Sequence, residues 1–137
     1  MITAVDSSVL LDVLTNHPVL GPASGRALAA ARNLGRVVIC PIVWAGVGAH
    51  FPDVGDLRRA LPGTGIRFDP FDERCADLAA RQWREYRRRG GRRKGVVADF
   101  FVGAHAQARA QALLTRDRGF YRRCFEPLRV IEPEPAH

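Results

Sequence analysis

Short apolar runs alternate with longer segments of helical spacing along this chain. The runs are rich in Val, Ile and Leu, as expected for parallel strands that are covered on both faces. Such strands are predicted at residues 2–5, 36–40, 66–68, 113–114 and 128–131. Because strands and helices alternate throughout, the sequence predicts an α/β fold, a three-layer α/β/α sandwich with a mostly parallel central sheet.

The segments between these runs predict helices, and their ends are marked by glycines, prolines and polar residues. The longest helix begins at residues 71–73, and its apolar positions recur three and four residues apart. A Ser is a candidate N-cap of the first helix, Gly35 closes the second, and Pro41 opens the third. The other helices, the last of them a short helix or turn, are predicted at residues 7–14, 23–34, 42–51, 53–61, 99–111 and 119–123.

The length of 137 residues and the hydrophobic content of 47% fit one domain with a single core. We expect residues 1–132 to form this domain and residues 133–137 to be a short disordered tail. No run approaches the roughly 18 apolar residues of a membrane span. The first residues lack the pattern of a signal peptide, so we expect a cytoplasmic protein without membrane contact. The three cysteines have neither metal-ligand nor disulfide spacing and are expected to be free thiols.

The charge is strongly positive, with 21 Lys and Arg against 14 Asp and Glu, a net charge of +7. All but one of these cations are arginine, which makes forked contacts to phosphate and carboxylate. Nucleic acid or an acidic protein segment is therefore the expected partner. A GC-rich genome would explain the preference for arginine over lysine, but not the net charge. Seven cations fall within residues 84–94, a density that favours substrate or partner contact over a merely solvated face.

Three carboxylates stand where predicted elements meet. Asp6 follows the first strand, Asp117 follows the fourth, and Asp99 lies in the first turn of an apolar helix. Each has a simpler interpretation: Asp6 as a helix cap, Asp99 as a partner of the helix dipole, and Asp117 as a partner of Arg116 or Arg118. In a parallel sheet, however, the first and fourth strands can bring their carboxyl ends side by side, which is where ligands bind in such sheets.

Carboxylates brought this close repel one another unless a cation joins them. Oxygen ligands select hard ions such as Mg²⁺ or Mn²⁺, which can activate water and bind phosphate oxygens. A site formed by Asp6, Asp99 and Asp117 would thus suit phosphodiester hydrolysis. The arginine-rich segment would hold a polyanionic substrate over it.

Four segments of the chain form a recognisable set: residues 5–11, residues 41–51, Asp-Phe-Phe-Val-Gly-Ala-His-Ala at 99–106 and Leu-Thr-Arg-Asp-Arg-Gly-Phe-Tyr at 114–121. The last two are the most specific. Together the four segments resemble the PIN-domain family, and more narrowly the VapC-type ribonuclease toxins of bacterial toxin–antitoxin modules. The likeness covers nearly the whole chain.

The resemblance implies a Mg²⁺- or Mn²⁺-dependent endoribonuclease with a quartet of acids around the metal. Three of the four map onto Asp6, Asp99 and Asp117, and Ser8 and Thr115 match hydroxyl positions beside the site. It further implies a homodimer, and a cognate antitoxin whose C-terminal segment covers the acidic pocket and can insert an arginine into it. The expected contacts with RNA or antitoxin are Arg87, Arg88, Arg89, Arg92, Arg93, Lys94 and Arg116.

The fourth acid of the family pattern is a glutamate in the helix that follows Pro41, and this chain has Gly46 there. Neither Asp53 nor Asp56 stands at a matching place. Either the glutamate was lost in a natural or laboratory variant, or the natural protein carries Gly46 and is impaired. A glycine inside a helix costs about 1 kcal/mol against alanine, which favours the first explanation.

Two other functions stay open from the sequence. A PIN-like module could bind an antitoxin or RNA without turnover, because of Gly46. A phosphotransfer enzyme with an aspartate nucleophile would need an acid two residues after Asp6, where Ser8 stands.

Overall fold

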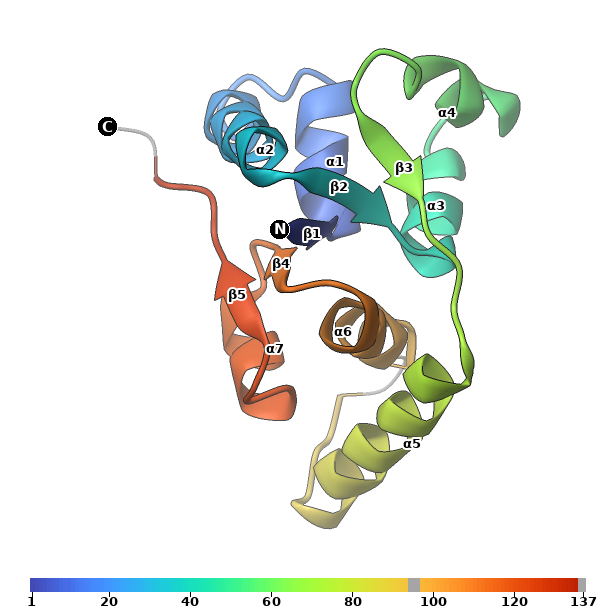
Figure 1. The fold of residues 1–137 in the computed structure, drawn as a ribbon, viewed down its shortest axis with the longest axis vertical. Helices are drawn as coiled ribbons and strands as arrows, with labels where there is room; N and C mark the ends of the chain where they lie inside the picture. Colours follow the sequence, from blue (N-terminus) through green and yellow to red (C-terminus); the bar gives the residue numbers. More distant parts are fainter. Residues whose placement is uncertain (94–96, 136–137) are drawn as a thin grey trace.

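The computed structural model describes residues 1–93 and 97–135, and it contains a five-stranded sheet with helices on both faces (Figure 1). The strands are β1 (Ile2–Val5), β2 (Arg36–Ile39), β3 (Ile66–Phe68), β4 (Ala112–Leu114) and β5 (Arg129–Ile131). The helices are α1 (Ser7–Leu14), α2 (Gly21–Leu34), α3 (Pro41–Gly48), α4 (Gly55–Ala60), α5 (Glu73–Arg88), α6 (Val97–Arg109) and α7 (Arg118–Cys124). The predicted α/β/α sandwich is confirmed. Lys94 lies outside the described residues.

Every strand pairing is parallel, and the strand order is β3-β2-β1-β4-β5. In this order β1 lies between β2 and β4, with Ala4 opposite Val38 and Val5 opposite Leu114. The chain therefore leaves β1 toward one edge of the sheet and later returns on its other side. The crevice at the carboxyl ends of β1 and β4 is the topological switch point, the place where open α/β sheets bind ligands.

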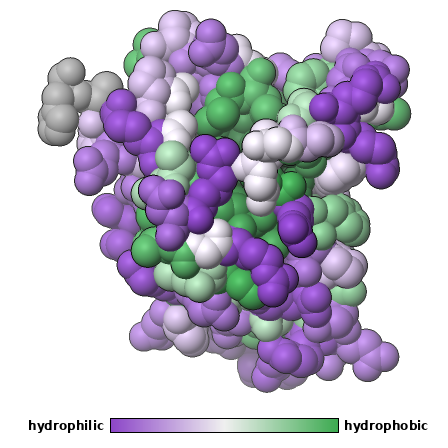
Figure 2. Space-filling model, turned by 45° about the horizontal axis from the view of Figure 1, so that its top comes forward, coloured by the Kyte–Doolittle hydropathy of each residue, from purple (hydrophilic) through white to green (hydrophobic). Residues whose placement is uncertain are grey.

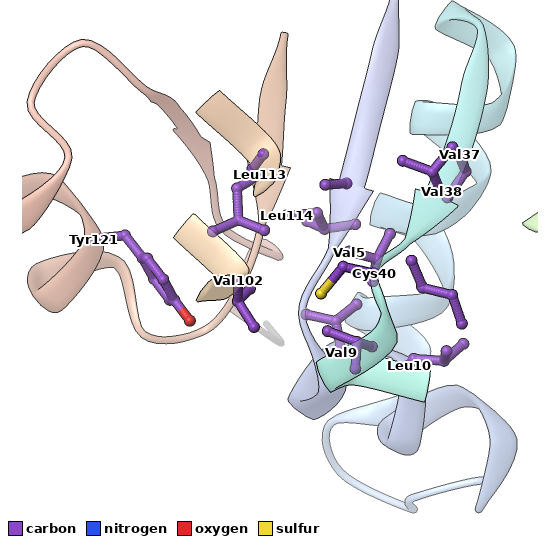
Figure 3. Close-up of a cluster of buried hydrophobic side chains, with 14 of the residues drawn as sticks. Val5, Val9, Leu10, Val37, Val38, Cys40, Val102, Leu113, Leu114 and Tyr121 are labelled. Atoms are coloured by element: carbon purple, nitrogen blue, oxygen red, sulfur yellow. The ribbon is translucent and has the colours of Figure 1, made fainter. Parts of the chain in front are cut away.

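The helices form two layers, with α1, α2 and α3 on one side of the sheet and α5, α6 and α7 on the other (Figure 1). Between them the strands are nearly continuous apolar runs, and Figure 3 shows Val5, Leu113 and Leu114 packed against helix residues such as Val9 and Val102. On the α6 side the core is aromatic, with Phe100, Phe120, Tyr121 and Phe125 all at most 1% exposed. This packing fixes α6 and α7, which carry two of the predicted acids.

Several element ends differ slightly from the sequence predictions. The N-cap of α1 is Asp6 rather than a Ser, because its side chain accepts a hydrogen bond from the Ser7 backbone N–H. α3 ends at Gly48 instead of continuing to residue 51. Gly35 does close α2, with a φ of 151°. It must be glycine, because a Cβ there would lie 2.0 Å from the Met1 carbonyl oxygen. The first residue of the predicted tail, Pro133, is buried, and the division into domain and tail stays a prediction.

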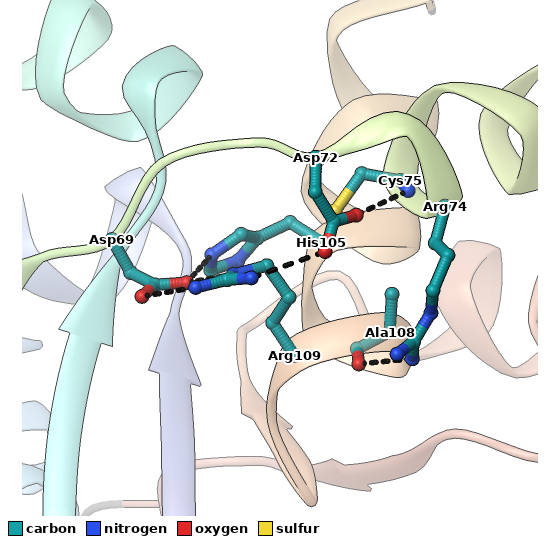
Figure 4. A network of polar contacts seen from close by, with 7 residues as sticks. All are labelled: Asp69, Asp72, Arg74, Cys75, His105, Ala108 and Arg109. Carbon is teal, nitrogen blue, oxygen red and sulfur yellow. Dashed lines mark hydrogen bonds and ion pairs between the residues drawn. The ribbon is translucent and has the colours of Figure 1, made fainter.

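A polar cluster connects α6 to the segment between β3 and α5 (Figure 4). Asp69 accepts two hydrogen bonds from Arg109, at 2.6 and 3.1 Å, and lies 2.8 Å from Nε2 of His105. Arg109 also contacts Asp72, which caps α5 by accepting from the Cys75 N–H. His105 is thus a hydrogen-bonded core histidine, and this cluster fixes the position of the helix that carries Asp99.

Candidate acidic site

Asp6 is the best-organised residue of the site. It follows β1, and its backbone N–H donates to the Leu114 carbonyl of β4 at 2.9 Å. One carboxylate oxygen accepts from the Ser7 N–H at 2.8 Å and the other from the Thr115 hydroxyl at 2.7 Å. The residue is only 8% exposed. Burial raises the pKa of Asp6 despite these donors, and the nearby charge of Asp117 raises it further.

Asp117 reaches the same edge of the sheet through the loop after β4. Thr115 organises this loop, because its hydroxyl oxygen accepts from the Asp117 N–H at 3.0 Å while the same hydroxyl donates to Asp6. The two arginines that flank Asp117 point elsewhere. Arg116 pairs with Asp12 at 2.9 Å, and Arg118 pairs with Glu132 at 3.3 Å. Asp117 therefore does not pair with either of these neighbouring arginines.

Asp99 comes from the first turn of α6, as predicted. Its side chain is about one-third exposed. Burial is the main reason that the pKa of Asp99 is raised, and the charges of Asp6 and Asp117 add to the effect, whereas Arg93 opposes it. Asp6, Asp99 and Asp117 thus lie near enough for the charge of one to affect another.

Arg93 extends from the segment after α5 to the acids. Its guanidinium lies 3.8 Å from Asp99 and 3.6 Å from Asp117, measured to Oδ2 of each carboxylate. It also lies over the ring of Phe120, 5.2 Å from the ring centroid. Sequence analysis predicted Arg93 as a contact for RNA or antitoxin. It gave no signal for this pairing, because the pairing depends on the fold of the segment that follows α5.

The carboxylates supply only oxygen donors, which is the chemistry that Mg²⁺ and Mn²⁺ prefer. Their mutual repulsion also calls for a cation at this edge. Within residues 1–93 and 97–135, however, no group of three or more His, Cys, Asp or Glu side chains stands ready to hold a metal ion. Asp6, Asp99 and Asp117 therefore suit a divalent ion by donor type, and they would have to draw together around it.

Gly46 lies in α3 and is exposed, beside the first turn of α1. A Cβ at this position would have the Cβ of Ser7, 4.0 Å away, as its nearest neighbour outside the backbone of α3. A Cβ therefore fits here without displacing anything. A side chain here would start next to the residue that follows Asp6, so the place where the family pattern expects an acid adjoins the site.

The two predicted hydroxyls have different surroundings. Thr115 bonds to Asp6, as described above, whereas Ser8 Oγ is buried and has no hydrogen-bond partner among the described residues. Sequence analysis missed Tyr121, whose hydroxyl is also buried and unpaired within that part of the chain. Burial raises the pKa of Tyr121 far above its usual value, and the charges of the three acids add to this shift. A tyrosine one turn after Asp117, in the short helix predicted at residues 119–123, was the available signal.

The predicted basic contacts divide into two groups. Arg116 is bound to the buried Asp12, which also accepts from the Ser24 hydroxyl at 2.7 Å, so Arg116 has a structural role here. The other described contacts are exposed at and beyond the end of α5, namely Arg87, Arg88, Arg89, Arg92 and Arg93. The lower end of the molecule in Figure 2, where α5 ends, is mostly hydrophilic. Their contact with RNA or antitoxin stays a prediction for Arg87, Arg88, Arg89, Arg92, Arg93 and Arg116.

The protein is thus an α/β/α sandwich with a fully parallel sheet and three acids at the switch point of that sheet. The chain belongs to the PIN-domain family, because the PIN domain model matches residues 3–126. PIN domains are generally nucleases. No curated protein matches the chain.

Solved structures with the same fold come from several bacteria. VapBC2 of Rickettsia felis, bound to a DNA fragment from its promoter, has a TM-score of 0.76 at 17% identity and covers 98% of this chain and 100% of its own. A toxin–antitoxin complex of Klebsiella pneumoniae has a TM-score of 0.70 at 19% identity, with coverages of 98% and 99%. FitAcB of Neisseria gonorrhoeae has a TM-score of 0.69 at 23% identity, with coverages of 97% and 98%. At these identities the likeness establishes the fold.

Within the described part of the chain, no helix is both long and apolar enough to cross a membrane.

Proposed function

We propose that this protein is a VapC-type toxin, a Mg²⁺- or Mn²⁺-dependent endoribonuclease that hydrolyses an RNA phosphodiester. One observation carries the proposal. Asp6, Asp99 and Asp117 come from three distant segments to one edge of the sheet. Burial raises the pKa of Asp6 and of Asp99, the charge of Asp117 raises both further, and the charge of Asp6 also raises that of Asp99. A fold needs no such arrangement for stability, since like charges at a partly buried site oppose folding.

The three carboxylates would hold the divalent ion. When bound, such an ion activates water and stabilises the charge that develops on phosphate oxygens. Around it, the Ser7 N–H and the Thr115 hydroxyl orient Asp6 and leave each of its oxygens with one fixed donor. The exposed arginines beyond α5 would bind the phosphates on either side of the cleaved bond, since such contacts position nucleic acid without reading its sequence.

We further propose a homodimer and a cognate antitoxin. Support for the antitoxin comes from the chemistry of the acidic site, where the guanidinium of this chain's own Arg93 lies near Asp99 and Asp117. An antitoxin arginine would meet the same two carboxylates. The structures with the same fold include complexes named as toxin–antitoxin pairs. A cytoplasmic location stays a prediction.

A second function, a PIN-like module that binds antitoxin or RNA without turnover, is favoured by a different observation. Gly46 supplies no carboxylate, and the described residues contain no preformed group of three metal ligands. Such a module would keep the fold and the basic surface but would bind a divalent ion too weakly for hydrolysis.

Adding an acid at position 46 separates the two functions. Gly46→Glu should cleave RNA in the presence of Mn²⁺ and lose this activity in EDTA, and its induction should slow growth. Gly46→Ala is the matched control, because it adds a side chain without a carboxylate in the same open space. The double variant Gly46→Glu/Asp99→Asn should be inactive. If Gly46→Glu is as inert toward RNA as Gly46→Ala, the catalytic proposal fails and the binding module is favoured.

A further inference from the structure

We propose that Arg93 is an internal counter-ion of the acidic site, which bridges Asp99 and Asp117 until a divalent ion displaces it. The inference rests on the proposed metal centre, and it adds a side chain that competes with the ion for the carboxylates. It gives Arg93 a role different from that of the neighbouring arginines, which face solvent.

The guanidinium of Arg93 contacts carboxylates from two different elements. Nη2 lies 3.8 Å from Asp99 of α6, and Nη1 lies 3.6 Å from Asp117, the N-cap of α7. The ring of Phe120, in the first turn of α7, provides a third contact through its π face, 5.2 Å away. One side chain thus joins α6 to α7 at the point where their acids would otherwise repel each other.

The segment after α5 is shaped to bring Arg93 to this position. Gly90 has a φ of +81°, a conformation that favours glycine, and turns the chain at the end of the helix. The next residue, Gly91, donates its N–H to the Tyr86 carbonyl at 2.9 Å. A Cβ on Gly91 would lie 2.3 Å from the Tyr86 ring, so only glycine allows this approach. Finally, the Arg93 N–H donates to the Tyr86 hydroxyl at 3.0 Å.

Tyr86 is itself held by the aromatic core, with ring centroids 5.5 Å from Phe100 and 6.3 Å from Phe120. The backbone of Arg93 is therefore anchored to the same core that supports Asp99 and Asp117. This connection makes the pairing a property of the fold, unlike the contact of a free surface arginine, which would sample many positions.

The pairing is nevertheless weak enough to be displaced. Both N···O distances exceed that of a direct hydrogen bond, and the Arg93 side chain is 53% exposed, so solvent screens the attraction. A divalent ion carries twice the charge and coordinates the oxygens directly. Binding of the ion would release the guanidinium at the rim of the site, where it can meet an RNA phosphate.

The test is a Mn²⁺ titration of the full chain, with free Mn²⁺ measured by electron paramagnetic resonance. Arg93→Ala should bind Mn²⁺ with a Kd about fivefold lower than the unaltered chain, because two weak competing contacts are removed. Arg92→Ala is the matched control, since Arg92 is the exposed neighbour and makes no ion pair within residues 1–93 and 97–135. It removes the same charge, and its Kd should change by less than about twofold.

Thermal unfolding supplies a second measurement. Without a divalent ion, Arg93→Ala should unfold at a lower temperature than Arg92→Ala, and Mn²⁺ should remove most of this difference. Equal Mn²⁺ affinity of the two variants overturns the inference and leaves the metal centre intact. If no variant binds Mn²⁺, Gly46→Glu included, the metal centre itself is wrong and the inference falls with it.

Discussion

Thr115 donates its hydroxyl proton to Asp6 over 2.7 Å, although 109 residues separate the two in sequence. This bond joins the carboxyl ends of β1 and β4, which are neighbours in the sheet. It fixes one oxygen of a carboxylate that burial makes costly to ionise. The same hydroxyl oxygen accepts from the Asp117 N–H, so one side chain organises two of the three acids.

Because burial raises the pKa of Asp6, ionisation of this residue opposes folding. Asp6→Asn should therefore raise the free energy of unfolding at pH 7. The gain should be about 1.4 kcal/mol for every tenfold change in the acid dissociation constant of Asp6 on folding. Asparagine is also a good N-cap, because its single oxygen can accept from the Ser7 N–H. Its NH2 group would then face Thr115 and donate to the hydroxyl oxygen, in place of the bond that Asp6 accepts. Urea unfolding at pH 7 measures the difference.

The sign of the effect provides a check at low pH. A carboxyl whose pKa is raised on folding favours the folded state while it is protonated, and this advantage disappears as the pH rises through its folded pKa. The gain of Asp6→Asn should therefore vanish well below the unfolded pKa of 3.8. Asp77→Asn, an exposed change on α5, should have little effect at either pH. A loss of stability in Asp6→Asn at pH 7 would contradict the assignment.

Gly46→Ala should stabilise the protein by up to about 1 kcal/mol, because Gly46 is exposed inside α3 and its Cβ position is open. Gly46→Glu should gain less, since its carboxylate would come close to those of the site. Chemical denaturation of the two variants measures both effects. A loss of stability in Gly46→Ala would mean that position 46 is more tightly packed than its surroundings indicate.

Gly103 should respond in the opposite way, although it also lies inside a helix. It is buried in α6, and a Cβ there would lie 2.4 Å from the ring of Phe125. Gly103→Ala should therefore lose about 1–3 kcal/mol, as overpacked core substitutions do, despite the better helix propensity of alanine. Parallel urea curves for Gly46→Ala and Gly103→Ala test both statements in one experiment, and equal effects would contradict them.

The order and type of the elements could be predicted because apolar runs, caps and breakers act locally. Asp6 and Asp99 could be placed at their element ends for the same reason, and Gly35 closes α2 where its sequence position predicted. The sequence allowed the carboxyl ends of β1 and β4 to lie side by side in a parallel sheet, and the structure pairs these strands. The sequence could not fix this pairing, because strand order depends on contacts between distant segments.

The contacts of individual arginines could not be predicted from the sequence. Arg93 and Arg116 stand in similar basic surroundings in the chain, yet one contacts Asp99 and Asp117 while the other binds Asp12. The partner of a long, flexible side chain depends on which residues the fold brings near it, and the local sequence does not specify those residues. The polar cluster around Asp69 escaped prediction for the same reason, since its members come from the β3–α5 segment and α6.

Arg116→Ala should destabilise the protein by about 2–3 kcal/mol, because Asp12 is 4% exposed and would keep only the Ser24 hydroxyl as a side-chain partner. Arg118→Ala is the matched control. Its pair with Glu132 is exposed on both sides, so its loss should cost about 1 kcal/mol or less. Equal effects of the two changes on urea unfolding would argue against a structural role for Arg116 and in favour of a purely functional one.

His105 should make stability depend on pH below neutrality. It is 1% exposed, and burial lowers its pKa more than the contact with Asp69 raises it. We attribute this balance to Arg109, whose two hydrogen bonds to Asp69 neutralise much of that carboxylate's charge. A histidine with a lowered folded pKa is neutral in the folded state, so the unfolded chain takes up the proton first as the pH falls below about 6.5.

The folded state should therefore lose stability below pH 6.5, by up to about 1.4 kcal/mol per pH unit, until the folded pKa is reached. His105→Gln removes the titrating group and retains an amide that can donate to Asp69, so its urea midpoint should fall less steeply between pH 6.5 and 5. The carboxylates are present in both proteins, and their contributions cancel in the difference. Parallel profiles would show that His105 keeps its ordinary pKa, and a steeper fall for the variant would show that its pKa is raised. In either case the Asp69 carboxylate would be less fully neutralised by Arg109 than the contacts indicate.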